Sequence, residues 1–301
     1  MSARAISDIL LAATERLRAA GVDSPRGEAR RLLAHVLGVT PEDIVSANIP
    51  PQGAEVRERF EMLLARRARR EPLAYILGSR EFWSLDFAVG PDVLVPRPES
   101  EIMVEEALKR FPARDAPLRV LDLGTGSGCL LLAFLSERPA AEGLGVDISE
   151  GALAIARRNA ERLGLESRTR FLRGDWMDAV SGGWDVIFVN PPYIAEGDLT
   201  GLDPEIGQYE PRTALDGGAD GLAAYRCIAG ALRSHFRPGA RAFLEVGQGQ
   251  ASPVEGLLAE KGLSVEGTVC DLAGIPRCLV VNAGLLKITP KKELAIARRS
   301  G

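Results

Sequence analysis

The sequence Asn190-Pro191-Pro192-Tyr193 contains the residue types needed to hold a planar NH2 group. It follows the apolar run 184–189, which is rich in β-branched and aromatic residues and predicts a buried parallel strand. Neither proline has a backbone N–H, so the loop presents carbonyl oxygens in a fixed direction. The Asn190 side chain adds an acceptor and Tyr193 adds an aromatic face with a hydroxyl. This pattern indicates a site for an amide or an exocyclic base amine, at the carboxyl end of a strand in an open α/β sheet.

A glycine-rich turn upstream offers a place for the electrophile that such a weakly nucleophilic nitrogen needs. It follows a predicted strand at 120–123 and leads into a predicted helix at 129–135. Alternate glycines let the backbone approach a ligand closely, and the helix amino terminus offers free N–H groups. The spacing and the preceding Asp122 differ from the dinucleotide motif GxGxxG. An acidic residue there suits an amino-acid ammonium or a ribose better than a pyrophosphate, although a nucleotide-binding or dehydrogenase loop is an alternative. The turn consists of Gly124, Thr125, Gly126, Ser127 and Gly128.

Two further predicted strands also end in residues suited to bind a nucleoside. The strand at 143–146 ends in Asp147, and a carboxylate about 20 residues after such a glycine turn typically accepts hydrogen bonds from ribose hydroxyls. The strand at 169–173 is followed by Asp175 and Trp176, which could bind and stack an adenine. The alternatives are that Asp147 only caps a helix and that Asp175 and Trp176 are structural.

The order of these motifs resembles a class I S-adenosylmethionine-dependent methyltransferase that methylates amino groups. Asn-Pro-Pro-Tyr alone is shared with DNA adenine methyltransferases, but other segments resemble the protein-(glutamine-N5) methyltransferases that modify peptide chain release factors, the HemK/PrmC family. That resemblance covers roughly residues 5 to 283. The other segments are Val93–Glu101, Glu210-Pro211, Ala214–Gly218, Asp220–Leu222 and Asp271–Gly274.

The resemblance implies a Rossmann-like, mostly parallel seven-stranded sheet with a small N-terminal helical bundle. It implies methyl transfer from S-adenosylmethionine to a glutamine N5 in the Gly-Gly-Gln loop of class 1 release factors, leaving S-adenosylhomocysteine. The cofactor would contact the turn at 124–128, Asp147, Asp175, Trp176 and Asn190. Asn190 and Pro191 would be catalytic, and the substrate would contact Asn190, Pro191, Pro192, Tyr193 and Arg97.

Composition limits the remaining function classes. A length of 301 residues suggests about two domains. A net charge of −4 argues against a protein whose main role is to coat nucleic acid. The four cysteines lack CxxC spacing, so we expect buried free thiols, no metal site and a cytoplasmic location. No apolar run reaches the ~20 residues of a membrane span. We expect a monomer that needs neither a membrane nor a nucleic acid.

We expect four segments along the chain: an N-terminal helical substrate-recognition domain at 1–78, a β-hairpin linker at 79–95, the catalytic domain at 96–284 and a basic tail at 285–301. Four helices are expected in the first segment, and the hairpin is expected to turn at Gly90-Pro91. The arginines at 66–70 suit an acidic or nucleic-acid partner, or simply a solvated helix end. Proline-flanked Arg97 is expected to border the active-site mouth, with an ion pair to Glu99 or Glu101 as the alternative. The Gly- and Pro-rich segment 194–221 predicts a substrate lid.

Three rival functions fit parts of the pattern. Glutamine methylation of a ribosomal protein would use the same catalytic residues. An adenine amine of DNA or RNA also fits the acceptor loop, although no base-reading domain is evident. A non-catalytic translation-factor binding module is the third, and the intact Asn190 and glycine turn argue against it.

Overall fold

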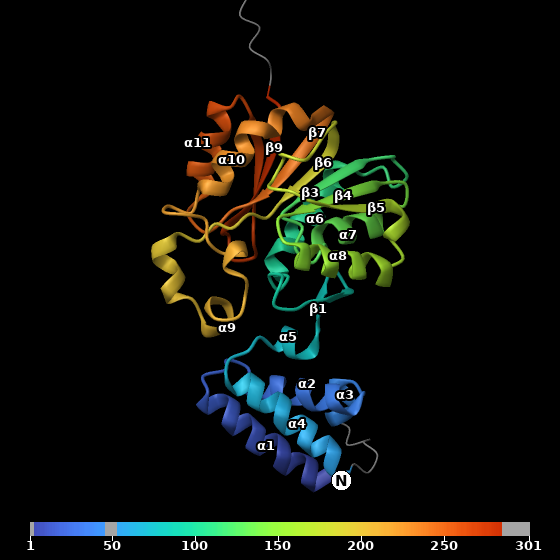
Figure 1. The fold of residues 1–301 in the computed structure, drawn as a ribbon, viewed down its shortest axis with the longest axis vertical. Helices are drawn as coiled ribbons and strands as arrows, with labels where there is room; N and C mark the ends of the chain where they lie inside the picture. The colour runs from blue at the N-terminus through green and yellow to red at the C-terminus, as the bar shows by residue number, and fades with distance from the viewer. Residues whose placement is uncertain (1–2, 46–52, 285–301) are drawn as a thin grey trace, which may run out of the picture.

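Seven strands form one mixed sheet at the centre of the larger part of the molecule (Figure 1). The computed structural model describes residues 3–45 and 53–284. The strands lie in the order β5-β4-β3-β6-β7-β9-β8; β9 runs antiparallel to both of its neighbours and the other pairs are parallel. The fold expected of a class I methyltransferase is therefore confirmed. The strands are β3 (Arg119–Leu123), β4 (Glu142–Asp147), β5 (Thr169–Arg173), β6 (Trp184–Val189), β7 (Phe236–Glu245), β8 (Ser264–Cys270) and β9 (Pro276–Asn282).

Helices cover both faces of this sheet, and the alternation of side chains in β6 shows why. Val186 and Phe188 pack into the core under α6, α7 and α8, whereas Ile187 and Val189 pack into the core under α10 and α11. Burying a side chain of this size stabilises the fold by about 1.5–3 kcal/mol. Because both faces of β6 are buried, apolar residues are favoured at successive positions, as in 186–189. These helices are α6 (Glu101–Arg110), α7 (Cys129–Glu137), α8 (Glu150–Arg162), α10 (Ala223–Leu232) and α11 (Ala251–Glu260).

The strand register aligns the ends of three strands. Leu123 in β3 pairs with Val146 in β4 and with Val189 in β6. The residues that follow these partners are Gly124, Asp147 and Asn190, so the glycine turn, the acidic strand tip and the acceptor loop begin at one level of the sheet.

In the described part of the first 78 residues, helices α1 to α5 share a hydrophobic core. Figure 1 shows this bundle below the sheet. Its core includes Leu17, Leu32, Phe60 and Leu64, all nearly inaccessible to solvent. The spacing of Ile6, Leu10, Leu11 and Leu17 predicts one apolar stripe on the first helix, but Leu11 is 63% exposed because the stripe runs along the other side of that helix. The helices are α1 (Ala3–Ala19), α2 (Pro25–Leu37), α3 (Pro41–Val45), α4 (Ala54–Ala68) and α5 (Leu73–Leu77).

The hairpin between the bundle and the sheet corrects one sequence prediction. Strands β1 (Ser79–Phe82) and β2 (Leu85–Ala88) are joined by Trp83 and Ser84, whose φ angles are +54° and +57°. Two residues with positive φ match the twist of a two-residue hairpin. The turn therefore does not lie at Gly90-Pro91, and Trp-Ser carries none of the usual turn signals. Helices α5, α6 and α11 were also not predicted.

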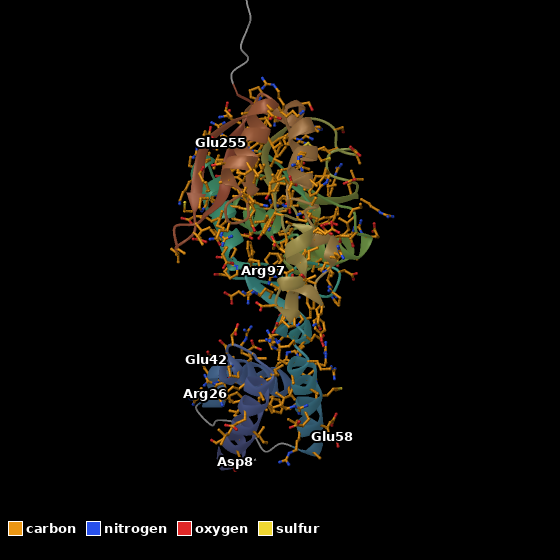
Figure 2. The ribbon with its side chains drawn as sticks, turned by 90° about the vertical axis from the view of Figure 1, so that its left-hand side faces the viewer. Asp8, Arg26, Glu42, Glu58, Arg97 and Glu255 are labelled. Atoms are coloured by element: carbon orange, nitrogen blue, oxygen red, sulfur yellow. The ribbon has the colours of Figure 1, made fainter. Side chains whose placement is uncertain are left out.

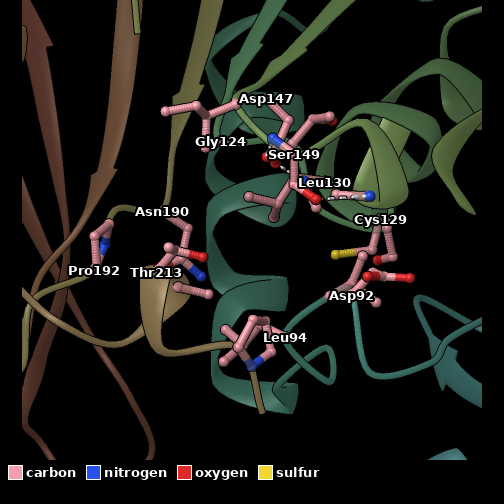
Figure 3. Close-up of a pocket in the computed structure, with 18 of the residues that line it drawn as sticks. Asp92, Leu94, Gly124, Cys129, Leu130, Asp147, Ser149, Asn190, Pro192 and Thr213 are labelled. Carbon is pink, nitrogen blue, oxygen red and sulfur yellow. Dashed lines mark hydrogen bonds between the residues drawn. The ribbon is translucent and has the colours of Figure 1, made fainter. Parts of the chain in front are cut away.

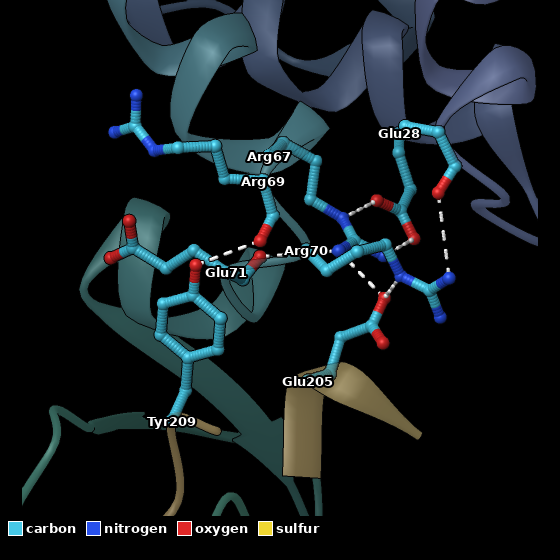
Figure 4. A network of polar contacts seen from close by, with 8 residues as sticks. Glu28, Arg67, Arg69, Arg70, Glu71, Glu205 and Tyr209 are labelled. Carbon is cyan, nitrogen blue, oxygen red and sulfur yellow. Dashed lines mark hydrogen bonds and ion pairs between the residues drawn. The ribbon is translucent and has the colours of Figure 1, made fainter. Parts of the chain in front are cut away.

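An ion-pair network joins the bundle to the segment between β6 and α10 (Figure 4). Arg67 on α4 contacts Glu28 on α2 and, at 2.8 Å, Glu205 on α9 (Pro204–Gly207). Arg70 also contacts Glu205, at 2.5 Å. The Arg67 side chain is only 6% exposed. The solvated helix end proposed for this arginine cluster is therefore wrong for Arg67, which binds carboxylates of the same chain.

Short 3-10 turns complete the connections. They are η1 (Pro98–Ser100), η2 (Glu166–Arg168), η3 (Glu196–Gly201), η4 (Arg212–Ala214) and η5 (Arg233–His235). The predicted tail 285–301 lies outside the described residues.

The cysteines correct one prediction. Cys278 is buried and Cys129 half-buried, but Cys227 and Cys270 are exposed, contrary to the expected burial of all four thiols.

None of the helices in the described ranges has the length and hydrophobicity needed to cross a membrane.

Arg67→Ala should lower the free energy of unfolding by about 3 kcal/mol, because Glu28 is left partly buried without its cation and Glu205 keeps only Arg70. Urea unfolding measures the loss. Arg16→Ala is the matched control, because its ion pair with Glu61 is about half exposed and should contribute less than about 1 kcal/mol. Equal losses in the two variants would contradict a stabilising role for the Arg67 network.

Candidate active site

A pocket opens at the carboxyl edge of β3, β4 and β6 (Figure 3). In Figure 3, Asn190 and Thr213 lie on one side of it, with Ser149 and Cys129 across from them. Pro191, Tyr193 and Gly128 are not among its lining residues, although the sequence placed them in the site. The predicted residues that do line it are Arg97, Gly124, Thr125, Gly126, Ser127, Asp147, Asp175, Trp176, Asn190 and Pro192.

The glycine turn brings three parts of the site together. Gly124 has a φ of +71°, a conformation that favours glycine. A Cβ atom at Gly124 would lie 3.5 Å from the ring of Trp176 and 3.9 Å from the backbone oxygen of Asn190. The indole, the turn and the start of the acceptor loop therefore meet at Gly124. Gly128 instead faces Leu132 and Ala156, on the protein side of the turn.

Asp147 holds the turn in place. Its Oδ2 accepts a hydrogen bond of 2.9 Å from the backbone N–H of Gly126, and its Oδ1 accepts one of 2.9 Å from that of Ser149. Ser149 in turn caps α8 by accepting from the N–H of Ala152. The carboxylate is half-buried and lines the pocket, so its remaining lone pairs can face a ligand.

Asp122 does not face the pocket, which corrects its proposed contact with an ammonium or ribose. It is 1% exposed, and Thr125 Oγ1 donates a hydrogen bond of 2.6 Å to it. The backbone N–H of Leu131, in the first turn of α7, lies near it and lowers its pKa. Burial raises the pKa of Asp122 to about 7, against the lowering effect of the Thr125 hydrogen bond. Asp122 thus stabilises the junction between the turn and α7.

Trp176 and Asp175 form another wall of the pocket. Trp176 adopts a φ of +47°, which is uncommon for a bulky residue. Its indole packs partly against the hydrophobic core and partly against the glycine turn. Asp175 is exposed, with its side chain at the pocket rim.

Arg97 does line the pocket, and its partner is Glu210, a residue of the family segments to which the sequence assigned no role. Its Nη2 contacts Glu210 Oε1 at 2.7 Å rather than Glu99 or Glu101. Glu210 also accepts from the backbone N–H of Val95 at 3.3 Å. Burial raises the pKa of Glu210, although Arg97 opposes that shift. In Figure 2, Arg97 lies on the part of the α/β body nearest the bundle.

The segment 194–221 closes one side of the pocket. Pro211, Thr213 and Ala214 line it. The same segment is tied to the bundle by Glu205 and by the Tyr209 hydroxyl, which donates 2.7 Å to the carbonyl oxygen of Arg69. This placement agrees with the predicted lid, and the lid function stays a prediction.

A buried polar cluster, which the sequence reasoning missed, lies behind the acceptor loop. Asn190 Nδ2 donates to Ser100 Oγ at 3.4 Å, and Ser100 donates to Glu245 Oε2 at 2.5 Å. Gln250 Nε2 donates 2.9 Å to the carbonyl oxygen of Tyr193. The available signal was a lone carboxylate, Glu245, at the end of the apolar run 240–246.

The seven-stranded sheet and the glycine-turn pocket at its carboxyl edge define a class I methyltransferase. Family models agree: residues 8–78 match the PrmC N-terminal domain and residues 100–202 match the methyltransferase small domain. A methyltransferase structure from Pyrococcus furiosus shares the fold, with a TM-score of 0.51 at 22% identity over 73% of this chain and 99% of that one.

Curated relatives narrow the class to one family. The chain is 47% identical to a release factor glutamine methyltransferase of Rhodospirillum rubrum, over 88% of this chain and 81% of that protein. It is 45% identical to the protein of the same name from Cereibacter sphaeroides, over 90% and 96% of the two chains. The chain belongs to the release factor glutamine methyltransferase family.

Asp122→Asn should become more stable relative to the wild type as pH rises from 5 to 8. In the folded protein Asp122 keeps its proton up to about pH 7, whereas in the unfolded chain it releases the proton near pH 4. Between these values the unfolded state is favoured by its ionised Asp122, so the free energy of unfolding of the wild type falls as pH rises. Asparagine carries no charge and can still accept from Thr125. Urea unfolding at several pH values measures the difference.

Asp115→Asn, at an exposed position, is the control for the removal of one carboxylate from the surface. A pH-independent difference for Asp122→Asn would show that Asp122 titrates like an exposed carboxylate.

Proposed function

We propose that this protein transfers a methyl group from S-adenosylmethionine to the side-chain amide nitrogen, N5, of the glutamine in the Gly-Gly-Gln loop of peptide chain release factors. One observation carries the proposal: the acceptor loop that begins at Asn190 and the glycine turn that begins at Gly124 open on the same pocket. Relatives that bear the name release factor glutamine methyltransferase support this assignment.

The residues of the pocket fit S-adenosylmethionine. The missing side chain at Gly124 leaves room beside the Trp176 ring that a Cβ atom would occupy. We assign the turn from Gly124 to Ser127 to the amino-acid half, Asp147 to the ribose hydroxyls, and Asp175 with Trp176 to the adenine. Bound there, the sulfonium supplies an electrophilic methyl group.

The acceptor loop would bind and orient the glutamine amide. The oxygens of the Asn190 side chain and the Pro191 backbone would accept the two amide hydrogens, so the nitrogen would present one face to the pocket. Asn190 lines the pocket and Pro191 lies next to it in the loop, outside the lining, so the role of Asn190 is the one that the geometry supports. An amide nitrogen is a weak nucleophile, so most of the acceleration would come from this alignment and from dipoles that are fixed before the reaction. Pro192 lines the pocket beside Asn190 and limits where the substrate can lie.

Pairing with Glu210 fixes Arg97 at the pocket, where its remaining donors can bind the backbone of the substrate loop. Tyr193 is partly buried against the hydrophobic core and does not line the pocket, so we assign it to the support of the acceptor loop more than to direct substrate contact. The helical bundle would dock the body of the release factor, because residues 8–78 match the PrmC N-terminal domain while the pocket lining begins at Asp92.

The test is methyl transfer from radiolabelled S-adenosylmethionine to a purified release factor, with a ribosomal protein and single-stranded DNA assayed in parallel. We expect label on the release factor, and its loss when the loop glutamine is replaced by alanine. Label on the ribosomal protein or on DNA alone would overturn the proposed substrate.

Asn190→Ala should reduce kcat for release factor methylation by at least about 100-fold, because it removes an acceptor that orients the nucleophile. S-adenosylmethionine affinity should fall only modestly, as measured by calorimetry. Asn282→Ala, which removes an amide bonded to Glu266 away from the pocket, is the matched control and should keep full activity. Full activity in Asn190→Ala would exclude the proposed mechanism.

Trp176→Ala should weaken S-adenosylmethionine binding by about 10- to 100-fold, since stacking of a base on an aromatic ring contributes about 1–3 kcal/mol. Calorimetry gives the dissociation constant. Trp83→Ala in the β1–β2 turn removes an indole that lies outside the pocket lining and should leave the affinity unchanged. An unaltered affinity in Trp176→Ala would remove this residue from the cofactor site.

A further inference from the structure

A hydrogen-bond chain with a defined direction runs behind the acceptor loop. It begins at the side-chain amide of Asn190, passes through Ser100 on η1 and ends at Glu245 on β7. Ser100 is 3% exposed and Glu245 is 5% exposed, so water does not compete for these bonds. Because Ser100 and Glu245 lie 90 and 55 residues from Asn190 in sequence, the chain exists only in the folded protein.

The chemistry of the three groups fixes the direction of the chain. An ionised carboxylate can only accept hydrogen bonds, so the single hydroxyl proton of Ser100 must go to Glu245. The Ser100 oxygen can then only accept, and the group of Asn190 that donates to it is the NH2. The amide oxygen of Asn190 is thereby left on the opposite side, free to accept.

Glu245 also lies near the other end of the acceptor loop. Burial and the nearby Glu245 carboxylate raise the pKa of the Tyr193 hydroxyl. The Tyr225 hydroxyl donates 2.8 Å to the backbone carbonyl oxygen of Glu245, which fixes the end of β7 against α10. One buried carboxylate therefore lies behind both ends of the acceptor loop and supports Asn190 through Ser100.

We infer that Ser100 and Glu245 are positioning residues for methyl transfer, which orient the Asn190 amide so that its oxygen faces the substrate nitrogen. Neither residue is assigned a contact with a reacting atom. The inference rests on the proposed function, in which the amide oxygen of Asn190 must face the substrate. The hydrogen-bond chain selects this orientation over the one in which the oxygen and nitrogen of the amide are exchanged.

The orientation of Asn190 should depend on the ionisation of Glu245. Burial raises the pKa of Glu245 to about 7, while its bond with Ser100 and the charge of Arg277 oppose that shift. Once protonated, the carboxyl group can donate to Ser100, which frees the Ser100 proton to point at Asn190 and removes the preference for its present orientation. The titratable and charged groups near Glu245 are Arg277 and Cys278 on β9, Glu99 on η1, Tyr193, Tyr225 on α10 and Cys129 on α7.

Steady-state methylation of release factor by the full-length protein tests this inference. Ser100→Ala should lower kcat about 30-fold at pH 8, with KM for the release factor and the dissociation constant of S-adenosylmethionine within about threefold of the wild type. In the wild type, kcat should rise with pH through about 7, and Glu245→Gln should lose this dependence. Ser100→Thr, which keeps the hydroxyl, should recover most of the activity.

Ser136→Ala is the matched control, because it removes a serine hydroxyl bonded to the carbonyl oxygen of Ala133 within α7. It should keep the wild-type kcat and pH profile. A folded Ser100→Ala protein with wild-type kcat, or one whose loss of activity is matched by the loss of cofactor affinity, would overturn the inference.

A second measurement needs no substrate. The side-chain amide resonances of Asn190 in 15N-labelled protein, assigned with Asn190→Ala, should shift with a midpoint near pH 7 and stay constant in Glu245→Gln. Resonances that do not move in the wild type between pH 6 and 8 would overturn the inference. Failure of the wild type to methylate release factor would instead overturn the proposed function, so the two failures can be told apart.

Discussion

The parallel register of β3, β4 and β6 is the constraint on which the site depends. Leu123 pairs with both Val146 and Val189, so three strands end at one level and the chain leaves each of them at the same edge. Parallel strands can only be joined by crossovers, which carry the intervening helices onto the faces of the sheet and leave that edge open. The glycine turn, the acidic tip and the acceptor loop thus come together without any direct link in sequence. Their common level is fixed by backbone hydrogen bonds and by an apolar core on both faces.

Three buried carboxylates stabilise this edge from inside the protein. Asp122, Glu210 and Glu245 are each no more than 6% exposed. Asp122 is bonded to Thr125 in the glycine turn and Glu210 to Arg97. Glu245 is bonded to Ser100, which in turn accepts from Asn190 of the acceptor loop. Burial of a charge is unfavourable unless hydrogen bonds offset it, so each carboxylate restricts its neighbours to one arrangement. The polar groups of the pocket are therefore held before any ligand arrives, as electrostatic catalysis requires.

The sequence predicted the sheet and most of the pocket because both follow from local patterns. Apolar runs ending in Gly124, Asp147 and Asn190 specify strands and the edge at which they end. The misses depended on long-range contacts. The sequence predicted a solvated Arg67, because its partner Glu205 lies 138 positions away. Ser100 links Asn190 to a carboxylate only because folding brings it to Glu245. Asp122 could have been placed correctly, since the two-residue period of its strand puts it on the face opposite Leu121 and Leu123.

The contacts of Glu205 with Arg67 and Arg70, at the end of α4, also bear on how domains could be exchanged between such proteins. The helical bundle has its own hydrophobic core and looks like an interchangeable module. However, Arg67 shares its charge between Glu28 inside the bundle and Glu205 in the segment that borders the pocket. A grafted bundle that lacked arginines at these positions would leave Glu205 without its cations unless the segment around α9 were transferred with it. The unit of exchange is therefore discontinuous in sequence: the first helices together with a short piece of chain more than 130 residues downstream.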